Sequence, residues 1–200
     1  MAKAPRKITT PLGMLEWDSI AAGLEATDGL FKQASVEPIL VRPVTPGRYV
    51  TLFTGEVESV RSALKRGADV GEAALVDSLF LPQPHVSLVP ALGARTRFKD
   101  LEAVGVIETL TLCSLLLAAD AAAKTGEVSL VEIRLAMGLG GKAFCVLSGE
   151  VSQVESAVSR GSLLAKERGY HLRSVVIPNP DAQMAPFLTS PTQPFSDLEI

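Results

Sequence analysis

The chain has 200 residues, 47% of them hydrophobic and only 5% aromatic, and it carries a formal net charge of −3. This length allows one large domain or two small ones with aliphatic cores, and the slightly acidic balance excludes the basic surface typical of nucleic-acid-binding proteins. Two cysteines give no disulfide framework, no apolar signal-peptide core follows the basic N-terminus, and the longest apolar run is too short to span a bilayer, so we expect a soluble cytosolic protein.

The first elements predicted along the chain are a strand and a helix. Apolar and polar residues alternate in LGMLEW, residues 12–17, which is typical of a strand with one buried face. Ser19 can cap the helix that follows, and Asp28 and Lys32, four residues apart, favour an ion pair on its exposed face. The apolar residues that fall near one 3.6-residue stripe of this helix are Ile20, Leu24, Leu30 and Phe31.

A hairpin, a second helix and a last strand are predicted next. The runs PILVRPV and RYVTLFT are rich in β-branched and aromatic residues and are separated by TPG, which predicts a hairpin. Glu56 stands at the start of the second helix, where a carboxylate is favourable at the positive end of the helix dipole. A buried stripe is expected from Val57, Val60 and Leu64, and ALVDSLFLP indicates the last strand.

The same elements then recur, because the sequence is written twice. Residues 12–36 align with residues 104–128 at an offset of 92, so that Asp120 and Lys124 repeat the expected exposed pair, and TGEVESVRSALKRG aligns with SGEVSQVESAVSRG at an offset of 94. Each copy therefore has the β-α-β-β-α-β order of a ferredoxin-like α+β sandwich, with one sheet face left open. We expect domains at residues 11–92 and 103–188, the linker GARTRFKDLE between them, and mobile tails at residues 1–10 and 189–200.

The repeated segments resemble the shell-protein domain of bacterial microcompartments. The resemblance lies in the openings LGMLEW and VGVIET, in the A-x-D-x-x-x-K segment of each first helix, and in the GEV-x-x-V-x-x-A segment of each second helix. Two such domains in unpermuted order resemble the tandem-domain shell proteins that form trimers. The resemblance implies a flat homotrimer of six domains, a pseudohexamer, that tiles with other shell proteins around enzymes in the cytoplasm. It implies a structural protein and no enzyme, with neither nucleic acid nor membrane as a partner.

The glycine-rich stretch RLAMGLGGKAF fits no common phosphate-binding loop. A Walker A loop needs glycine where Ala136 stands and Ser or Thr where Ala143 stands, and the G-x-G-x-x-G pattern also fails. In the resembling family the loop between the second and third strands lines a central pore, which implies that role here for residues 44–48 and 138–142. Glycines suit loops that crowd onto one axis. The residues implied to line the pore are Thr45, Pro46, Gly47, Gly138, Leu139, Gly140 and Gly141.

The cations that flank these loops are Arg42, Arg48, Arg134 and Lys142. They form either a funnel that favours anionic metabolites or ordinary solvated strand ends, and the sequence leaves both open. Lys32 and Lys124 fall where the family places the lysine that packs tile edge against tile edge, the alternative being the helical ion pair alone. Gln83 and Asn179 stand where relatives often carry an arginine that binds the neighbouring tile, which leaves the strength of the edge contact and the choice of partner open.

No cofactor and no catalytic site are predicted. Some tandem shell proteins carry a cysteine at the position of Thr45, and three of these cysteines hold an iron–sulfur cluster on the axis, for which a hydroxyl is a poor ligand. His85 and His171 have no serine or cysteine nucleophile beside them in the alignment of the two copies, and the histidines and cysteines lack the spacing of a zinc site. Cys113 and Cys145 are expected to be small buried residues.

Two functions from different classes follow from these observations. The first is a structural shell tile with a pore for small polar or anionic metabolites. The alternative is a trimeric small-ligand-binding regulator on the same ferredoxin-like scaffold. Both predict association of chains, because cores so poor in aromatic side chains leave each copy marginally stable without further burial.

Overall fold

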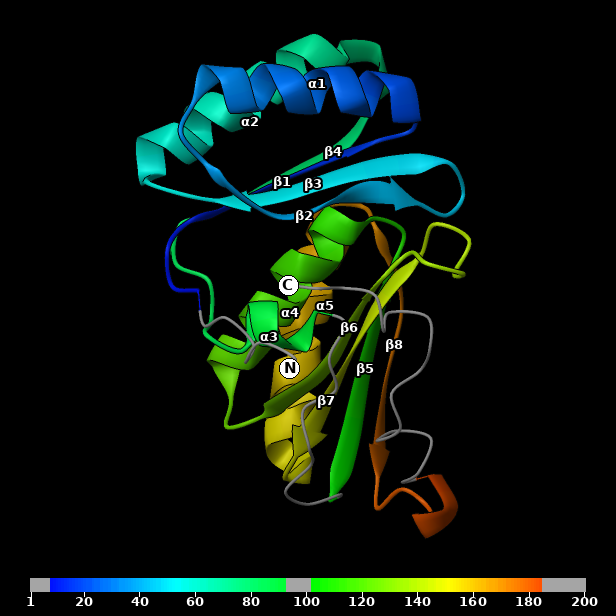
Figure 1. Ribbon diagram of the computed structural model, residues 1–200. Coiled ribbons are helices and arrows are strands. Elements are labelled where there is room, and N and C mark those ends of the chain that lie inside the picture. The colour runs from blue at the N-terminus through cyan, green and yellow to red at the C-terminus, as the bar shows by residue number, and fades with distance from the viewer. Residues whose placement is uncertain (1–7, 93–101, 185–200) are drawn as a thin grey trace, which may run out of the picture.

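Two four-stranded antiparallel sheets, each covered on one face by two long helices, make up the described part of the protein (Figure 1). The structure is a computed structural model that describes residues 8–92 and 102–184. In the first copy the elements are β1 (Leu12–Trp17), α1 (Ile20–Gln33), β2 (Glu37–Val44), β3 (Arg48–Thr54), α2 (Val57–Gly71) and β4 (Leu75–Leu81). In the second copy they are β5 (Ala103–Thr109), α4 (Leu112–Thr125), β6 (Ser129–Leu135), β7 (Ala143–Gly149), α5 (Val151–Glu167) and β8 (His171–Pro178). A short helix α3 (Leu88–Ala91) follows β4, and 3₁₀ turns lie at Glu72–Ala74 and Ala182–Met184.

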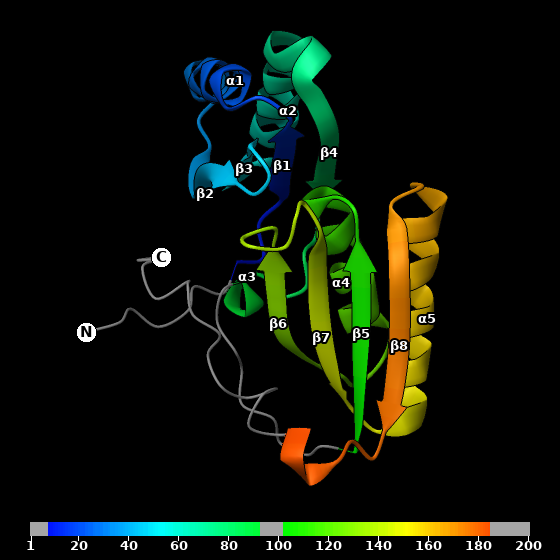
Figure 2. The same cartoon turned by 90° about the vertical axis from the view of Figure 1, so that its right-hand side faces the viewer.

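The order of strands is the same in both sheets and confirms the predicted β-α-β-β-α-β fold. The first sheet runs β2-β3-β1-β4 and the second runs β6-β7-β5-β8, which can be followed from one edge to the other in Figure 2. The registers also correspond, since Met14 pairs with Leu52 and its counterpart Val106 pairs with Val146. The chain is therefore two versions of one α+β unit.

The first helix of each copy begins where a hydroxyl side chain caps it. Ser19 Oγ accepts the Ala22 N–H at 3.3 Å before α1, and Thr111 Oγ1 accepts the Ser114 N–H at 3.3 Å before α4. Each bond satisfies an amide that the first helical turn leaves unpaired. The second helix of each copy follows a glutamate whose side chain makes no capping bond, so only its charge complements the helix dipole.

Buried clusters lie on both faces of the first sheet. Between this sheet and its own helices the cluster is built around Trp17, Leu30 and Phe53, which are fully buried. The opposite face of the sheet lies on α4 of the second copy (Figure 1) and joins the core of that copy in one continuous cluster. The residues of the first sheet on this face include Leu12, Met14, Val50, Leu52, Leu79 and Leu81.

Three expectations from the helix patterns are wrong. Ile20 and Leu24, expected in the buried stripe of α1, are 42% and 53% exposed, and Val57 at the start of α2 is 41% exposed. Asp120, expected on an open face of α4, is buried. The errors at α1 and α4 share one cause, because the first copy covers the outer face of α4 and the described residues contain no equivalent cover for α1.

The expected linker lies almost wholly outside the described residues, as do most residues of the expected tails. Next to β1, Ile8 is buried, and Thr10 Oγ1 lies 2.7 Å from Thr54 Oγ1, which joins Thr10 to the first sheet. Within residues 8–92 and 102–184, no helix is long and apolar enough to cross a membrane.

Candidate functional site

The two loops assigned to a pore lie against each other beside the ends of the two sheets (Figure 1). The Gly138 N–H donates to Thr45 Oγ1 at 3.3 Å. A Cβ placed on Gly141 would stand 3.0 Å from Pro46 Cδ, so the loops meet with little room for a side chain at that point. The fold of a single chain thus brings one loop from each copy to the same place.

Backbone geometry accounts for the glycines of both loops. Gly47, Gly138, Gly140 and Gly141 have φ angles of 80, 71, 60 and 86°, in the left-handed region that L side chains rarely adopt. A Cβ on the first three would meet nothing within 4 Å, so the turn and not crowding within the chain requires glycine there. Of the seven residues expected to line the pore, Gly141 is buried, Leu139 is half-buried and the others are exposed.

Glutamates of the same sheets pair with Arg48, Arg134 and Lys142 beside the loops. The pairs are Arg48–Glu16 at 2.6 Å, Arg134–Glu132 at 3.7 Å and Lys142–Glu108 at 3.6 Å. The Lys142 side chain is 49% exposed, compared with 25% for Arg48 and 13% for Arg134, and Arg42 is half-buried on β2. Among the three measured pairs, Lys142 therefore presents its charge most openly to solvent.

Glu16 is the polar centre of the contact between the two copies. Its side chain is fully buried, with Oε1 accepting from Arg48 and Oε2 accepting the Leu112 N–H at 2.9 Å. Leu112 is the first residue of α4, so the carboxylate lies at the positive end of that helix. Burial raises the pKa of Glu16, while the bonds from Leu112 and Arg48 act against that rise. Arg48 also donates to the Leu110 carbonyl at 3.2 Å, so this arginine joins the copies.

Asp77 on β4 forms a second polar cluster across the same contact. Its carboxylate accepts from Thr111 Oγ1 at 2.6 Å, from Ser114 Oγ at 3.1 Å and from Arg168 Nη2. Arg168 Nε also donates to Ser114 Oγ at 3.0 Å. Thr111 and Ser114 begin α4 and Arg168 follows α5, so one carboxylate of the first copy holds both helices of the second copy.

The turn after β4 extends the contact along α4. Asp120 Oδ1 accepts the His85 N–H at 2.7 Å, and Asp120 Oδ2 accepts from Lys124 Nζ at 2.6 Å. Lys124 Nζ also donates to the Gln83 carbonyl. Of the two lysines expected at a tile edge, Lys124 thus contacts the other copy of its own chain.

The matching surface of α1 is open. Ile20 and Leu24 occupy the places on α1 that Leu112 and Leu116 occupy on α4, yet Leu112 and Leu116 are fully buried whereas Ile20 and Leu24 are exposed. Asp28, the counterpart of the buried Asp120, has a side chain that is 62% exposed. The same helix face is therefore covered in one copy and bare in the other.

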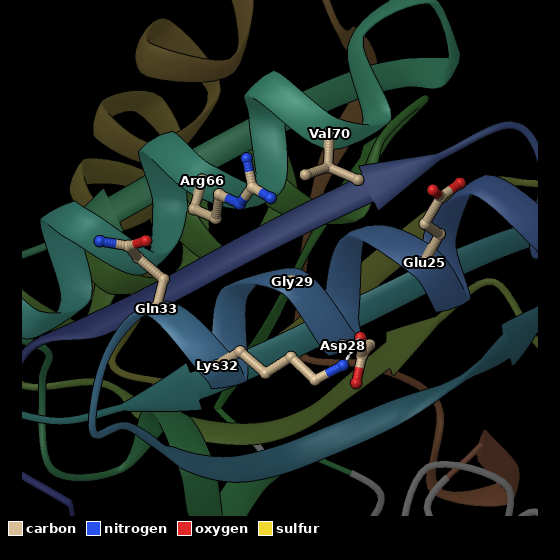
Figure 3. Close-up of a pocket in the computed structure, with 7 residues that line it drawn as sticks. All are labelled: Glu25, Asp28, Gly29, Lys32, Gln33, Arg66 and Val70. Atoms are coloured by element: carbon tan, nitrogen blue, oxygen red, sulfur yellow. Dashed lines mark hydrogen bonds and ion pairs between the residues drawn. The ribbon is translucent and has the colours of Figure 1, made fainter.

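A hollow of about 330 Å³ lies between α1 and α2 beside this open face (Figure 3). Lys32 Nζ bonds Asp28 Oδ2 at 2.6 Å there, and the Lys32 side chain is 74% exposed. On α4 the corresponding aspartate and lysine bond the turn at Gln83 and His85, and the aspartate is buried while the lysine side chain stays 44% exposed. The residues that line the hollow are Glu25, Asp28, Gly29, Lys32, Gln33, Arg66 and Val70.

The second sheet has the same outer face as the sheet that covers α4. Val175 and Ile177 on β8 correspond to Leu79 and Leu81 on β4, because each pair stands opposite equivalent residues of the central strand. Val175 and Ile177 are 40% and 39% exposed, whereas Leu79 and Leu81 are each 4% exposed. Within the described chain the first sheet therefore packs on α4. The second sheet and α1, which have the equivalent surfaces, are left exposed to solvent.

Each histidine lies beside a serine, which the alignment of the copies did not lead us to expect. His85 Nδ1 is 2.7 Å from Ser87 Oγ, and His171 Nε2 is 3.3 Å from Ser174 Oγ. These are local contacts two and three residues along the chain, and Asp120 accepts from the main-chain N–H of His85 and not from its ring. Among the described residues, no nucleophile, base and orienting acid form a triad at either histidine.

Cys113 and Cys145 are fully buried, which confirms the expectation that they are small core residues. Burial raises the pKa of Cys145 to about 12 and also raises the pKa of Cys113, so the reactive thiolate is disfavoured at both. Among the residues that the structure describes, no group of three His, Cys, Asp or Glu side chains is placed to hold a metal ion.

Sequence reasoning missed the residues that join the two copies, namely Glu16, Asp77 and Arg168. One signal was available for Glu16, because it occupies an outward position of a strand whose other outward residues are Leu12 and Met14. A carboxylate among apolar neighbours of the same face indicates a buried partner. Asp77 offers the same signal, because Leu79 and Leu81 share its face of β4. Arg168 carries no comparable signal, since it follows a helix and its partners lie in the other copy.

The BMC domain family model matches residues 11–84 and again residues 103–180. The bacterial microcompartment shell protein PduT of Citrobacter freundii is 38% identical over 173 residues, covering 86% of this chain and 94% of its own. A crystal structure of a microcompartments protein from Desulfitobacterium hafniense DCB is 42% identical, with a TM-score of 0.78 over 88% of this chain and 98% of that chain. The carboxysome shell protein CsoS1 of Prochlorococcus marinus is 37% identical over 86 residues, which are 41% of this chain and 82% of its own.

We expect Asp77→Ala to lower the free energy of unfolding by about 2–4 kcal/mol, because it removes the carboxylate that Arg168 and two hydroxyls share in a largely buried contact. The matched control is Lys65→Ala, which breaks the exposed Lys65–Asp69 pair at 2.6 Å and should cost less than about 0.5 kcal/mol. Urea unfolding measures both values. Equal losses in the two variants would contradict the central role of Asp77.

Proposed function

Because the chain belongs to the BMC-domain family and is a tandem-domain shell protein of a bacterial microcompartment, we propose that three chains assemble into a tile with a central pore for small polar or anionic metabolites. Shell proteins of this family are structural components and not enzymes, as expected from the sequence. They assemble with themselves and with other shell proteins. The trimer, the pore and its cargo are the parts that we propose.

The observation that carries the proposal is the contrast between α1 and α4. The first sheet covers α4, whose outer face is buried, while α1 is bare and the matching face of the second sheet is partly exposed. The second copy of one chain can therefore cover α1 of the next chain by the contact already present within the chain. A contact between two different surfaces either closes into a ring or extends without end, and six equivalent domain contacts close with three chains.

The correspondence between the copies also assigns polar groups to the contact between chains. Glu108 would accept the Ile20 N–H at the start of α1 of the next chain, as Glu16 accepts the Leu112 N–H within the chain. The turn PNPD, residues 178–181, would fill the hollow between α1 and α2 of that chain. Buried apolar area and satisfied polar groups would then coincide, as they do in the contact between the copies.

A ring of three chains would bring three pairs of glycine loops around one axis. Thr45 Oγ1 accepts from Gly138, which leaves the Thr45 hydroxyl proton to donate toward the axis. The half-exposed Lys142 side chain supports a preference for anions, whereas Arg48 is held by Glu16 in the contact between the copies. The pore would thus offer hydroxyl donors with lysine charges near its rim.

The hollow beside α1 is the observation that favours the alternative, a trimeric regulator that binds a small ligand. Its lining is mostly polar and includes Glu25, Lys32 and Arg66, which suit a charged ligand. The tile hypothesis instead fills this hollow with protein from the next chain. Electron microscopy of concentrated protein separates the two, because sheets or tubes support a tile, and trimers without lateral association favour the regulator.

We expect the protein at micromolar concentration to have a native mass three times that of the 21.1 kDa chain. Leu24→Glu should shift it to monomers, because it places a charge where the next chain is proposed to bury apolar surface. Leu163→Glu, at a residue of α5 that is 46% exposed and that the first copy leaves uncovered, is the control and should leave the mass unchanged. The proposal would be contradicted if the wild type were a stable monomer, or if the Leu24→Glu variant still formed trimers.

We expect Lys32→Glu to abolish sheets seen by electron microscopy and to leave trimers intact. Its counterpart Lys124 keeps 44% of its side chain exposed in the equivalent contact within the chain, so Lys32 would still reach the proposed edge where tiles meet. Lys32 is a sharper test than Lys124, whose ammonium also joins the two copies within the chain. Lys65→Glu changes the same charge in another exposed lysine–aspartate pair and serves as the control. Loss of trimers together with sheets would place Lys32 inside the ring, and unchanged sheets would reduce it to a helical ion pair.

We expect anaerobically purified protein to be colourless and free of iron, because Thr45 presents a hydroxyl where a cluster requires thiolates. Thr45→Cys should bring three thiols together on the axis and take up an iron–sulfur cluster during anaerobic reconstitution. The wild type, whose two cysteines are buried, is the control in the same reconstitution. Absorbance and iron content report the outcome. If the cysteine variant binds no iron, Thr45 does not lie at the axis and the assignment of the loop is wrong.

A further inference from the structure

The two sides of the repeated contact carry charges of opposite sign, and we propose that Arg173 of one chain pairs with Glu72 of the next chain. This pair would be the reverse of the Asp77–Arg168 pair within the chain, where the sheet supplies the acid and the helical side supplies the base. The inference rests on the proposed trimer, and it identifies residues that decide which surfaces meet.

Arg173 occupies the position of Asp77. Asp77 stands opposite Glu16 across β4 and β1, and Arg173 stands opposite Glu108 across β8 and β5. Both residues therefore lie on the outer face of a sheet, at the place where that face meets the beginning of a helix in the contact. At this position the first copy has an acid and the second copy has a base.

Glu72 occupies the position of Arg168 when the two copies are matched backwards from their last strands. The Asp18 N–H donates to the Ala74 carbonyl at 2.9 Å, and the equivalent Leu110 N–H donates to the Tyr170 carbonyl at 2.9 Å, which fixes Ala74 as the counterpart of Tyr170. Glu72 stands two residues before Ala74, as Arg168 stands two residues before Tyr170. At this junction between helix and strand the base of the second copy is thus replaced by an acid in the first copy.

Both proposed partners are available for contact. Arg173 and Glu72 are exposed, and neither has an ion-pair partner within residues 8–92 and 102–184. Glu108, which stands opposite Arg173, has Lys142 at 3.6 Å. In the proposed ring Arg173 would face Glu72 of the next chain as Asp77 faces Arg168.

The reversal distinguishes correct contacts from wrong ones. Before the two copies of a chain have packed together, a contact between the sheet of one first copy and the helices of another first copy would place Asp77 beside Glu72. The corresponding contact between two second copies would place Arg173 beside Arg168. An exposed ion pair adds little stability, but attraction in the correct contact and repulsion in both wrong ones add up to selectivity. Charge at this junction thus makes first and second copies alternate around the ring.

The test is a dilution series of trimers followed by native mass measurement. Arg173→Glu should raise the concentration of half-dissociation by about tenfold, because it replaces attraction by repulsion at every junction between chains. Glu72→Arg should have a similar effect, and the combination of the two changes should restore the wild-type value. Arg160→Glu makes the same charge change as Arg173→Glu at an exposed residue of α5, outside the contact, and should have little effect.

The outcomes separate this inference from the proposed function. A wild-type protein that forms no trimer overturns both. If the wild type forms trimers but Arg173→Glu dissociates no more readily than Arg160→Glu, the ion pair is wrong and the proposed tile is unaffected. The same holds if the double variant dissociates as readily as either single variant. Restoration by the reversed combination supports the pair, because damage to the fold by each half would not be cancelled by the other.

Discussion

Each copy of the domain has two apolar surfaces to cover, the outer face of its sheet and the outer face of its first helix. Within residues 8–92 and 102–184 one such sheet face meets one such helix face, where the first sheet lies on α4. Leu79 and Leu81 are buried by this contact, and their counterparts Val175 and Ile177 are not. The burial of apolar surface is the dominant favourable term in folding and association, so the described chain leaves apolar surface that the proposed contact with a like chain would cover.

Apolar burial alone does not fix the orientation of the sheet on the helix, and the polar groups of the contact do fix it. Glu16 is fully buried and needs both Arg48 and the first amide of α4, so the sheet can lie on the helix in one register only. Asp77 adds a second fixed point through Thr111 and Arg168. Buried carboxylates of this kind cost free energy unless every partner is in place, which makes them better at specifying a contact than at strengthening it.

The fold was predictable because its signals are local: strand alternation, a hydroxyl cap such as Ser19, and the repetition of both along the chain. Burial on α1 and α4 was mispredicted because apolar spacing does not say which surface is covered within the chain. Ile20 and Leu24 have the pattern of buried residues, and Asp120 has the pattern of an exposed one. The meeting of the glycine loops could be expected only through the family resemblance, since residues far apart in sequence create it. The partners of Glu16 and Asp77 in the other copy could not be identified for the same reason, although a carboxylate on an apolar strand face does indicate some buried partner.

The contact between the first sheet and α4 also affects how the proposed ring would assemble. Because a covalent connection already holds one domain against the next, half of the six contacts in the proposed ring form at a rate that does not depend on protein concentration. Assembly of the proposed ring then needs three chains to associate, so the equilibrium concentration of rings varies with the third power of the free-chain concentration. For six separate domains it would vary with the sixth power of the free-domain concentration. A tandem chain that forms the proposed ring could therefore complete it at a low concentration at which unlinked domains would remain apart.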